Sequence, residues 1–199
     1  MSDIVIATRN AGKVKEINAI LRGMNATVYS LRDFGDTPEI VEDGKTFEEN
    51  ASKKARIISQ CTNKLTIADD SGLEVDFLGG RPGVRSSRFA GEDGDYLKNN
   101  KLLLRLMDGV PNYKRGARFV CVISIAQKGK ILEVVRGTCT GRIALKMRGK
   151  TGFGYDPLFI DPKTNKTFAE LGPRAKNRIS HRYRALKKAR KALKRFLDN

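Results

Sequence analysis

The sequence predicts an α/β fold with a mixed central β-sheet. Apolar strand patterns alternate with amphipathic helix patterns, one strand pair is joined by a tight turn, and no repeat or low-complexity linker interrupts the alternation. Alternation favours parallel strands, whereas a tight turn requires an antiparallel pair, so the sheet is expected to be mixed. The chain has 199 residues, 40% of them hydrophobic. It can therefore bury a sizeable core, and we expect one domain over residues 1–199.

The N-terminal half begins with a strand, a turn and a helix. Residues 4–8 are a continuous apolar run, and RNAGK then opens a helix with one apolar face. Thr46 and Glu49 have capping-box spacing, which predicts a second helix reaching about residue 60. Asn50 and Lys54 fall on or beside its apolar side. Polar residues in that position need a partner or a function, although Asn50 could also simply cap a turn.

Two adjacent acids follow the next strand pattern. Residues 65–68 are apolar and lead directly into Asp69 and Asp70. Open α/β sheets bind ligands at the carboxyl ends of their strands, which favours a site over a pair of solvated surface acids. Carboxylates at such a position could hold a hard cation.

The C-terminal half supplies a hairpin and a glycine-rich loop. Asp95 begins a leucine-rich helix to about residue 107, and QKGK joins a strand over residues 119–125 to one over 131–135. The loop GKTGFGYDPLF, residues 149–159, has the spacing of neither a P-loop nor a dinucleotide fingerprint. Its aromatic residues suit stacking on a flat ligand and suit a structural turn equally well.

The chain is strongly basic, with 39 Lys and Arg against 22 Asp and Glu and a net charge of +17. This favours an anionic partner, which could be nucleic acid, nucleotide or phosphate. Much of the excess lies in RYRALKKARKALKRF, residues 182–196, an amphipathic helix with one apolar and one basic arc. We interpret the basic arc as a solvated face and expect no specific nucleic-acid binding, because no aromatic residue lies among the charges of that arc. Arg182 falls on the apolar arc, after the possible N-cap Ser180, so its guanidinium should point inward.

The cysteine and histidine content limits where in the cell the protein is expected to reside and which metal ions it could bind. Three cysteines without close spacing and a single histidine, His181, argue against a disulfide framework and a zinc site. Apolar runs are far shorter than the roughly 20 residues of a membrane span, and no charged leader precedes the first strand. We therefore expect a cytoplasmic protein with no membrane partner.

Five motifs in order give the sequence a family resemblance: TRNAGK, EDGKTFEENASKKA, ADDSGLEVDFLGGRPGVRSSRFAG, GFGYDP and KNRISHRYRAL. From residue 4 to about 186 the chain resembles the Ham1-like inosine/xanthosine triphosphate pyrophosphatases. The resemblance implies an elongated central mixed sheet with helices on both sides, two lobes forming a substrate cleft, and a homodimer. It also implies Mg²⁺-dependent hydrolysis of ITP, dITP and XTP to the monophosphate and pyrophosphate, which clears these nucleotides from the pool used for DNA and RNA.

The resemblance further implies roles for individual residues. Glu42 and Asp70 would bind Mg²⁺, and Asp70 would also be the base for the attacking water. Phe153 would stack on the purine. The implied substrate-binding residues are Thr8, Arg9, Asn10, Ala11, Gly12, Lys13, Asn50, Lys54, Ser71, Phe153, Gly154, Tyr155, Asp156, Lys176, His181 and Arg182. Arg9 is a departure, because the family often has glycine at that position.

Two other classes of protein remain open from sequence. One is a basic nucleic-acid-binding protein that uses its last helix, and the other is a nucleotide sensor that binds without hydrolysis. Asp70 and Glu42 separate these from an enzyme, because neither a binder nor a sensor needs a metal-bound base.

Overall fold

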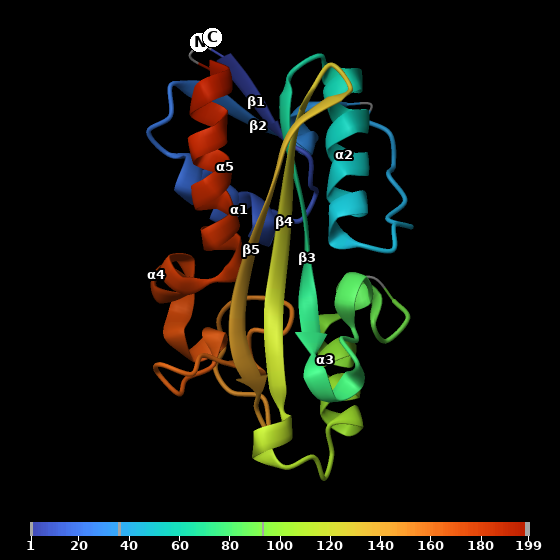
Figure 1. Ribbon diagram of the computed structural model, residues 1–199, viewed down its shortest axis with the longest axis vertical. Coiled ribbons are helices and arrows are strands. Elements are labelled where there is room, and N and C mark those ends of the chain that lie inside the picture. The colour runs from blue at the N-terminus through green and yellow to red at the C-terminus, as the bar shows by residue number, and fades with distance from the viewer. Residues whose placement is uncertain (1, 36, 93, 198–199) are drawn as a thin grey trace. The chain divides into compact units, whose positions relative to one another are not determined.

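The computed structural model describes residues 2–35, 37–92 and 94–197 and has the predicted α/β architecture (Figure 1). Its strands are β1 Ser2–Ile6, β2 Ala26–Ser30, β3 Leu65–Val75, β4 Gly116–Gln127, β5 Lys130–Ile143 and β6 Phe159–Ile160. Its α-helices are α1 Ala11–Leu21, α2 Phe47–Thr62, α3 Tyr96–Leu106, α4 Phe168–Ile179 and α5 His181–Leu197. None of these described helices combines the length and apolar character needed to cross a membrane.

The six strands form one sheet in the order β2-β1-β3-β4-β5-β6. The sheet is mixed, as predicted, because β1 pairs in parallel with β2 and β3 while β5 pairs antiparallel with β6. The predicted hairpin is confirmed: β4 and β5 are separated by two residues, Lys128 and Gly129, both with positive φ. Such a pair of φ angles matches the twist of a two-residue hairpin.

Two compact units make up the chain. The first contains the residues up to Asp70, then Cys121–Gly137 and the chain from Arg182 onward, and the second contains Ser71–Val120 and Thr138–His181. The single domain over residues 1–199 stays a prediction, and its Met1, Asp36, Asp93, Asp198 and Asn199 lie outside the described residues. The predicted substrate cleft between lobes also stays a prediction.

The first unit has helices on both sides of its strands, as predicted. Alternate side chains of a strand point to opposite faces, and in β1 Ile4 and Ile6 join one apolar cluster while Val5 joins another. The Ile4 cluster contains residues of α1 and α5, and the Val5 cluster contains residues of α2. Figure 1 shows α1 and α5 on one side of the strands and α2 on the other.

The second unit encloses an aromatic core. Phe119, Phe159 and Phe168 lie with ring centroids 4.5 to 5.8 Å apart. Beside this core, buried Arg115 donates hydrogen bonds to the carbonyls of Met107, Val110, Ile143 and Ala144. These bonds satisfy the buried guanidinium and tie the end of α3 to the end of β5, so Arg115 has a structural role.

The strand that carries the paired acids is longer than predicted. The expected strand ends at residue 68, whereas β3 continues to Val75, so Asp69 and Asp70 lie inside the strand and not at its end. The parallel pairing of β1 with β3 nevertheless stops at Ile6 and Ile67. The acids therefore follow the carboxyl end of this parallel ladder, while β3 continues beside β4.

Candidate active site

The N-terminal half of α2 places two polar side chains against the paired acids. Thr46 caps the helix by accepting a hydrogen bond from the Glu49 amide, but the Glu49 carboxylate accepts from the Lys45 amide, one residue before the cap. The predicted reciprocal box is thus only half formed. Asn50 and Lys54 are 0% and 7% exposed, which confirms their predicted inward direction.

Asn50 and Lys54 both contact carboxylates in the first unit. The Asn50 side chain donates from Nδ2 to Asp70 Oδ2 at 3.0 Å and accepts from the Gly44 amide at 2.8 Å, so its amide orientation is fixed. The Lys54 ammonium pairs with Glu42, donates to the Asp69 carbonyl at 2.7 Å and lies 4.0 Å from Asp70 Oδ1. Glu42 and Asp70, the predicted metal ligands, therefore face the same cation.

Asp70 is buried, with 4% of its surface exposed. Burial raises the pKa of its carboxyl above the ordinary value and Glu42 adds to this, although Lys54, Lys13 and the Asn50 hydrogen bond oppose the shift. A raised pKa makes the ionised carboxylate a stronger proton acceptor, which suits a general base.

Asp69 faces a different set of partners. Its Oδ2 lies 3.2 Å from Lys13 Nζ and 3.3 Å from Arg182 Nη2, and the Arg182 guanidinium also pairs with Glu16. Burial acts to raise the pKa of Asp69, but Lys13, Arg182 and Lys54 outweigh it and hold that pKa well below its usual range. Asp69 is therefore ionised and anchors two cations. The inward direction predicted for Arg182 is confirmed, since it is 2% exposed.

The turn between β1 and α1 was predicted to bind phosphate. Asn10 is the N-cap, and its Oδ1 accepts hydrogen bonds from the Gly12 and Lys13 amides at 3.0 and 3.2 Å. Two of the helix-start amides thus already donate to their own cap. Thr8 Oγ1 accepts from the Asn10 amide, and exposed Arg9 donates to Thr37. Of the predicted residues in this turn, Lys13 is the one whose charged group reaches the acids; Ala11 begins α1 and is exposed.

A second cluster lies in the other unit, around the glycine-rich loop. Phe153 is half-buried, and Lys176 Nζ lies 4.5 Å from its ring centroid. The Lys176 ammonium also pairs with Asp156 Oδ2 at 2.6 Å, and the same oxygen accepts from the Phe153 amide at 2.9 Å. Gly152 has φ of +86°, and a Cβ there would overlap Asp156 Oδ2. The loop therefore requires glycine for its approach to Asp156.

Helix α3 braces this loop, which sequence reasoning did not foresee. Asn100 is 3% exposed and donates from Nδ2 to the carbonyls of Gly154 and Tyr96, each at 2.8 Å. The Tyr96 ring lies 6.1 Å from the Phe153 ring. A polar residue on the buried side of the leucine-rich helix was the available signal, of the same kind that singled out Asn50.

The other predicted residues of the second unit have structural contacts. The Tyr155 hydroxyl donates to the Ser86 carbonyl at 2.9 Å, and burial raises its pKa far above the ordinary value. The His181 ring stacks on Phe119 with centroids 4.6 Å apart. Ser71 follows Asp70 in β3 and is partly exposed. The roles predicted for these residues toward a ligand stay predictions.

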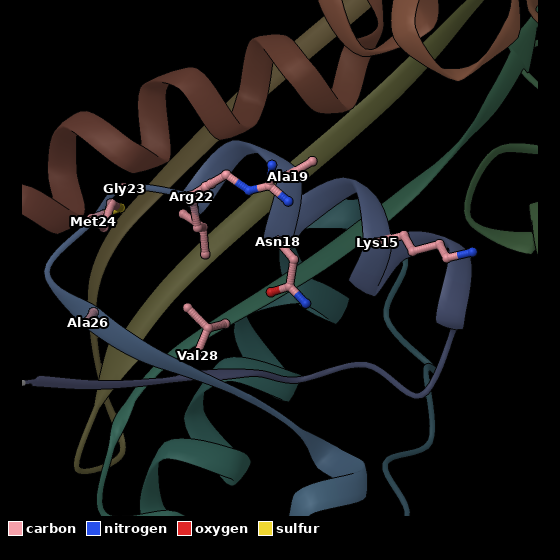
Figure 2. Close-up of a pocket in the computed structure, with 9 residues that line it drawn as sticks. Lys15, Asn18, Ala19, Arg22, Gly23, Met24, Ala26 and Val28 are labelled. Carbon is pink, nitrogen blue, oxygen red and sulfur yellow. The ribbon is translucent and has the colours of Figure 1, made fainter.

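The structure also contains a pocket elsewhere. Figure 2 shows it between the C-terminal half of α1 and strand β2, with Lys15, Asn18 and Arg22 among its lining residues. None of the predicted site residues lines it. It is open and includes neither acid of the β3 pair, so we place the chemistry at the acids and not in this pocket.

The fold and the buried carboxylate–lysine cluster define an α/β protein with a compact charged site. The chain belongs to the Ham1 family, which it matches over residues 4–192. A protein named dITP/XTP pyrophosphatase from Geobacillus kaustophilus is 53% identical over 188 residues, covering 94% of this chain and 92% of that protein. One of the same name from Bacillus subtilis is 48% identical over 193 residues, with coverages of 97% and 98%. The structure of a HAM1 protein from Coxiella burnetii matches with a TM-score of 0.89 and 38% identity, covering 98% of this chain and 100% of that one. The family resemblance predicted from sequence is confirmed.

Proposed function

We propose that the protein hydrolyses the non-canonical purine nucleoside triphosphates ITP, dITP and XTP to the monophosphate and pyrophosphate. This would remove them from the pool that supplies DNA and RNA synthesis. Family membership and the names of the curated relatives support the proposal. The observation that carries it is Asp70, a buried carboxylate of raised pKa that Asn50 orients beside Lys54.

The cations of the first unit suit a triphosphate. A triphosphate carries about four negative charges, which repel a nucleophile until they are neutralised. Lys13 and Lys54 are held near the β3 acids by Asp69 and Glu42. Lys13 would contact the phosphates from the start of α1, and Thr8 and Asn10 would contact them from the preceding turn.

We propose Mg²⁺ as the cofactor, held by Glu42 and Asp70. Among the described residues there is no group of three or more His, Cys, Asp or Glu side chains that could hold a metal. Mg²⁺ does not need one, since it is usually bound by one or two carboxylates together with substrate phosphates. Glu42 and Asp70 both face the Lys54 ammonium, so the pair already holds a positive charge. When bound, the metal ion would offset charge on the phosphates.

In this proposal, Asp70 activates the attacking water molecule. Asn50 Nδ2 donates a hydrogen bond to Asp70 Oδ2 and so orients the carboxylate, and the Gly44 amide donates to Asn50 Oδ1 and so orients Asn50. A carboxylate held in this way can orient a water molecule toward the α-phosphorus and accept its proton. Lys54, which contacts the Asp69 carbonyl and Glu42, would balance the charge beside the base.

In this proposal, His181, Arg182 and nearby backbone amides recognise the purine. Hypoxanthine and xanthine have a carbonyl acceptor at position 6, whereas adenine has an amino donor there. A site built of donors, such as His181, Arg182 and nearby amides, would accept the keto bases and reject adenine by up to about 10⁴-fold. Arg182 is ion-paired with Glu16 and Asp69 in this structure, so a base contact would add to those pairs.

Replacing Phe153 with Ala should lower kcat/KM for ITP, XTP and ATP to the same extent. Stacking on an aromatic ring tolerates any base and contributes about 1–3 kcal/mol, so kcat/KM should fall roughly tenfold for each nucleotide. Steady-state kinetics on the three substrates checks this, with Tyr113→Ala as the control, because Tyr113 is 82% exposed. A loss confined to ITP and XTP would instead make Phe153 a selectivity residue.

We further propose that the protein is a cytoplasmic homodimer. The resemblance supports dimerisation, and so do large apolar side chains exposed in the second unit, such as Phe77 and Leu145, which are 51% and 69% exposed. Exposed apolar groups of this size are often covered in an assembly. Light scattering of the purified chain measures the assembly state.

The proposed activity is tested with a panel of nucleotides. Pyrophosphate release from ITP, dITP, XTP, ATP and GTP in the presence of Mg²⁺ should give kcat/KM values at least about 10²-fold higher for the first three than for ATP. Binding of ITP without pyrophosphate release would identify a nucleotide sensor and refute the proposal.

A further inference from the structure

The exposed face of α5 is cationic and has no role in the site described above. The helix contains no acidic residue among its 17 positions. Its exposed residues, which we call the α5 basic face, are Arg184, Lys187, Lys188, Lys191, Lys194 and Arg195. At 1.5 Å per residue this face extends for about 16 Å.

The described carboxylates offset only part of the charge on this face. Lys188 donates to the carbonyl of Arg136, which adds no negative charge, and Arg195 pairs with Glu133. In the part of the chain that the structure describes, no carboxylate pairs with Lys187, Lys191 or Lys194. The face is therefore a row of positive charge that a polyanion can neutralise.

The opposite side of α5 restricts the kind of polyanion. Ala185, Leu186, Ala189 and Leu193 are fully buried in the core of the first unit. The helix thus has no apolar side left to enter a bilayer, as a membrane-surface helix must. Between Arg184 and Arg195 the helix has no aromatic residue that could stack on unpaired bases. Contact with the phosphate groups of a duplex needs neither an apolar side nor a stacking aromatic residue.

We propose that the α5 basic face is a docking surface for the phosphate backbone of duplex nucleic acid, bound without regard to sequence. A duplex carries one charge per about 1.7 Å of axis when both strands are counted, so a 16 Å length carries roughly nine phosphates, and part of these lie on the side that faces α5. The phosphates on that side can pair with Lys187, Lys191 and Lys194, the three lysines without a carboxylate partner among the described residues. The expectation against specific nucleic-acid binding is unaffected, because phosphate contacts carry no sequence information. The surface would hold the protein near polymers independently of any hydrolytic activity.

The salt dependence of binding tests this surface. Fluorescence anisotropy with a labelled 30-base-pair DNA duplex, and with an RNA duplex of the same sequence, would be measured across a range of NaCl concentrations. Each neutralised phosphate contributes about −0.9 to the slope of log K against log [salt]. The triple variant Lys187→Gln, Lys191→Gln, Lys194→Gln should therefore have a slope about 2.7 less negative than the native protein.

A charge-matched variant provides the control. Lys101→Gln, Lys146→Gln, Lys163→Gln removes the same charge from exposed positions of the second unit, and it should keep the native slope. Glutamine has nearly the helix propensity of lysine, so circular dichroism and Tm should match among the three proteins. ITP turnover should also match, which separates this proposal from the proposed function.

Three outcomes would overturn the proposal. If the slope of log K against log [salt] became less negative by the same amount in both triple variants, duplex binding would depend on the net charge of the protein and not on the α5 basic face. Absence of duplex binding at low salt would show that the α5 basic face is not a docking surface for nucleic acid. Binding to phosphatidylserine vesicles in preference to both duplexes, lost in the α5 variant, would assign the face to a membrane surface instead.

Discussion

Asp70→Asn should lower pyrophosphate release from ITP by about two orders of magnitude or more, the scale expected for loss of a general base. The substitution preserves the shape of the side chain but removes its charge and its basicity. Asn50 and Lys54, which contact the carboxylate, remain in place to hold nucleotide. Nucleotide affinity should therefore fall much less than turnover, and single-turnover kinetics with a separate binding measurement distinguishes the two.

The control for this variant is Asp108→Asn, at an exposed acid in the second unit. It should hydrolyse ITP at the native rate. Native-like turnover in Asp70→Asn with Mg²⁺ would disprove the role of Asp70 as base.

In the absence of metal, Asp70→Asn should be at least as stable as the native protein. Burial raises the pKa of Asp70, so its ionised form is disfavoured in the folded state relative to the unfolded state. A raised carboxyl pKa contributes stability at low pH that is lost as the pH rises through the folded-state value. At neutral pH the neutral Asn side chain removes this cost, and the urea midpoint should stay constant or rise.

Asp69→Asn should have the opposite effect and destabilise the fold strongly. Lys13 and Arg182 converge on Asp69 Oδ2, and its loss leaves the buried Arg182 and the partly buried Lys13 with one fewer carboxylate. Breaking a buried ion pair from one side typically costs about 3–5 kcal/mol. Urea unfolding of the variant at pH 7 measures this, and a midpoint equal to the native one would show that the pairs contribute nothing.

The effect of Asp69 should depend on pH in a defined direction. Its pKa is held well below the usual range, so its contribution to stability is complete above the unfolded-state pKa, whose ordinary value is 3.8. The contribution decreases as the pH falls further toward the folded-state value. The stability difference between Asp69→Asn and the native protein should therefore be constant near neutrality and shrink in acid.

Several features of the fold and site follow from local sequence patterns. Helical periodicity placed Asn50, Lys54 and Arg182 on buried arcs, and their low exposure agrees with this. The hairpin was predictable because its two-residue turn contains Gly129, which accepts positive φ at no steric cost. Such features depend on residues a few positions apart, which periodicity and turn chemistry detect.

Other features depend on contacts between distant parts of the chain. The Asp69–Arg182 pair spans 113 positions, and no local pattern distinguishes the anchoring acid Asp69 from its neighbour Asp70. The length of β3 depends on its neighbour β4, which is supplied by residues 116–127. Helix α4 has a non-helical Gly172 followed by Pro173, two residues that normally end a helix, and it was not predicted.

Hydrolysis of ITP in ¹⁸O-labelled water tests the central claim most directly. If Asp70 directs water to the α-phosphorus, the label must enter the monophosphate, and the pyrophosphate must be released unlabelled. Mass spectrometry of both products after a single turnover gives the answer. Label in pyrophosphate, or release of orthophosphate in place of pyrophosphate, would contradict the proposed attack and the assignment of this site.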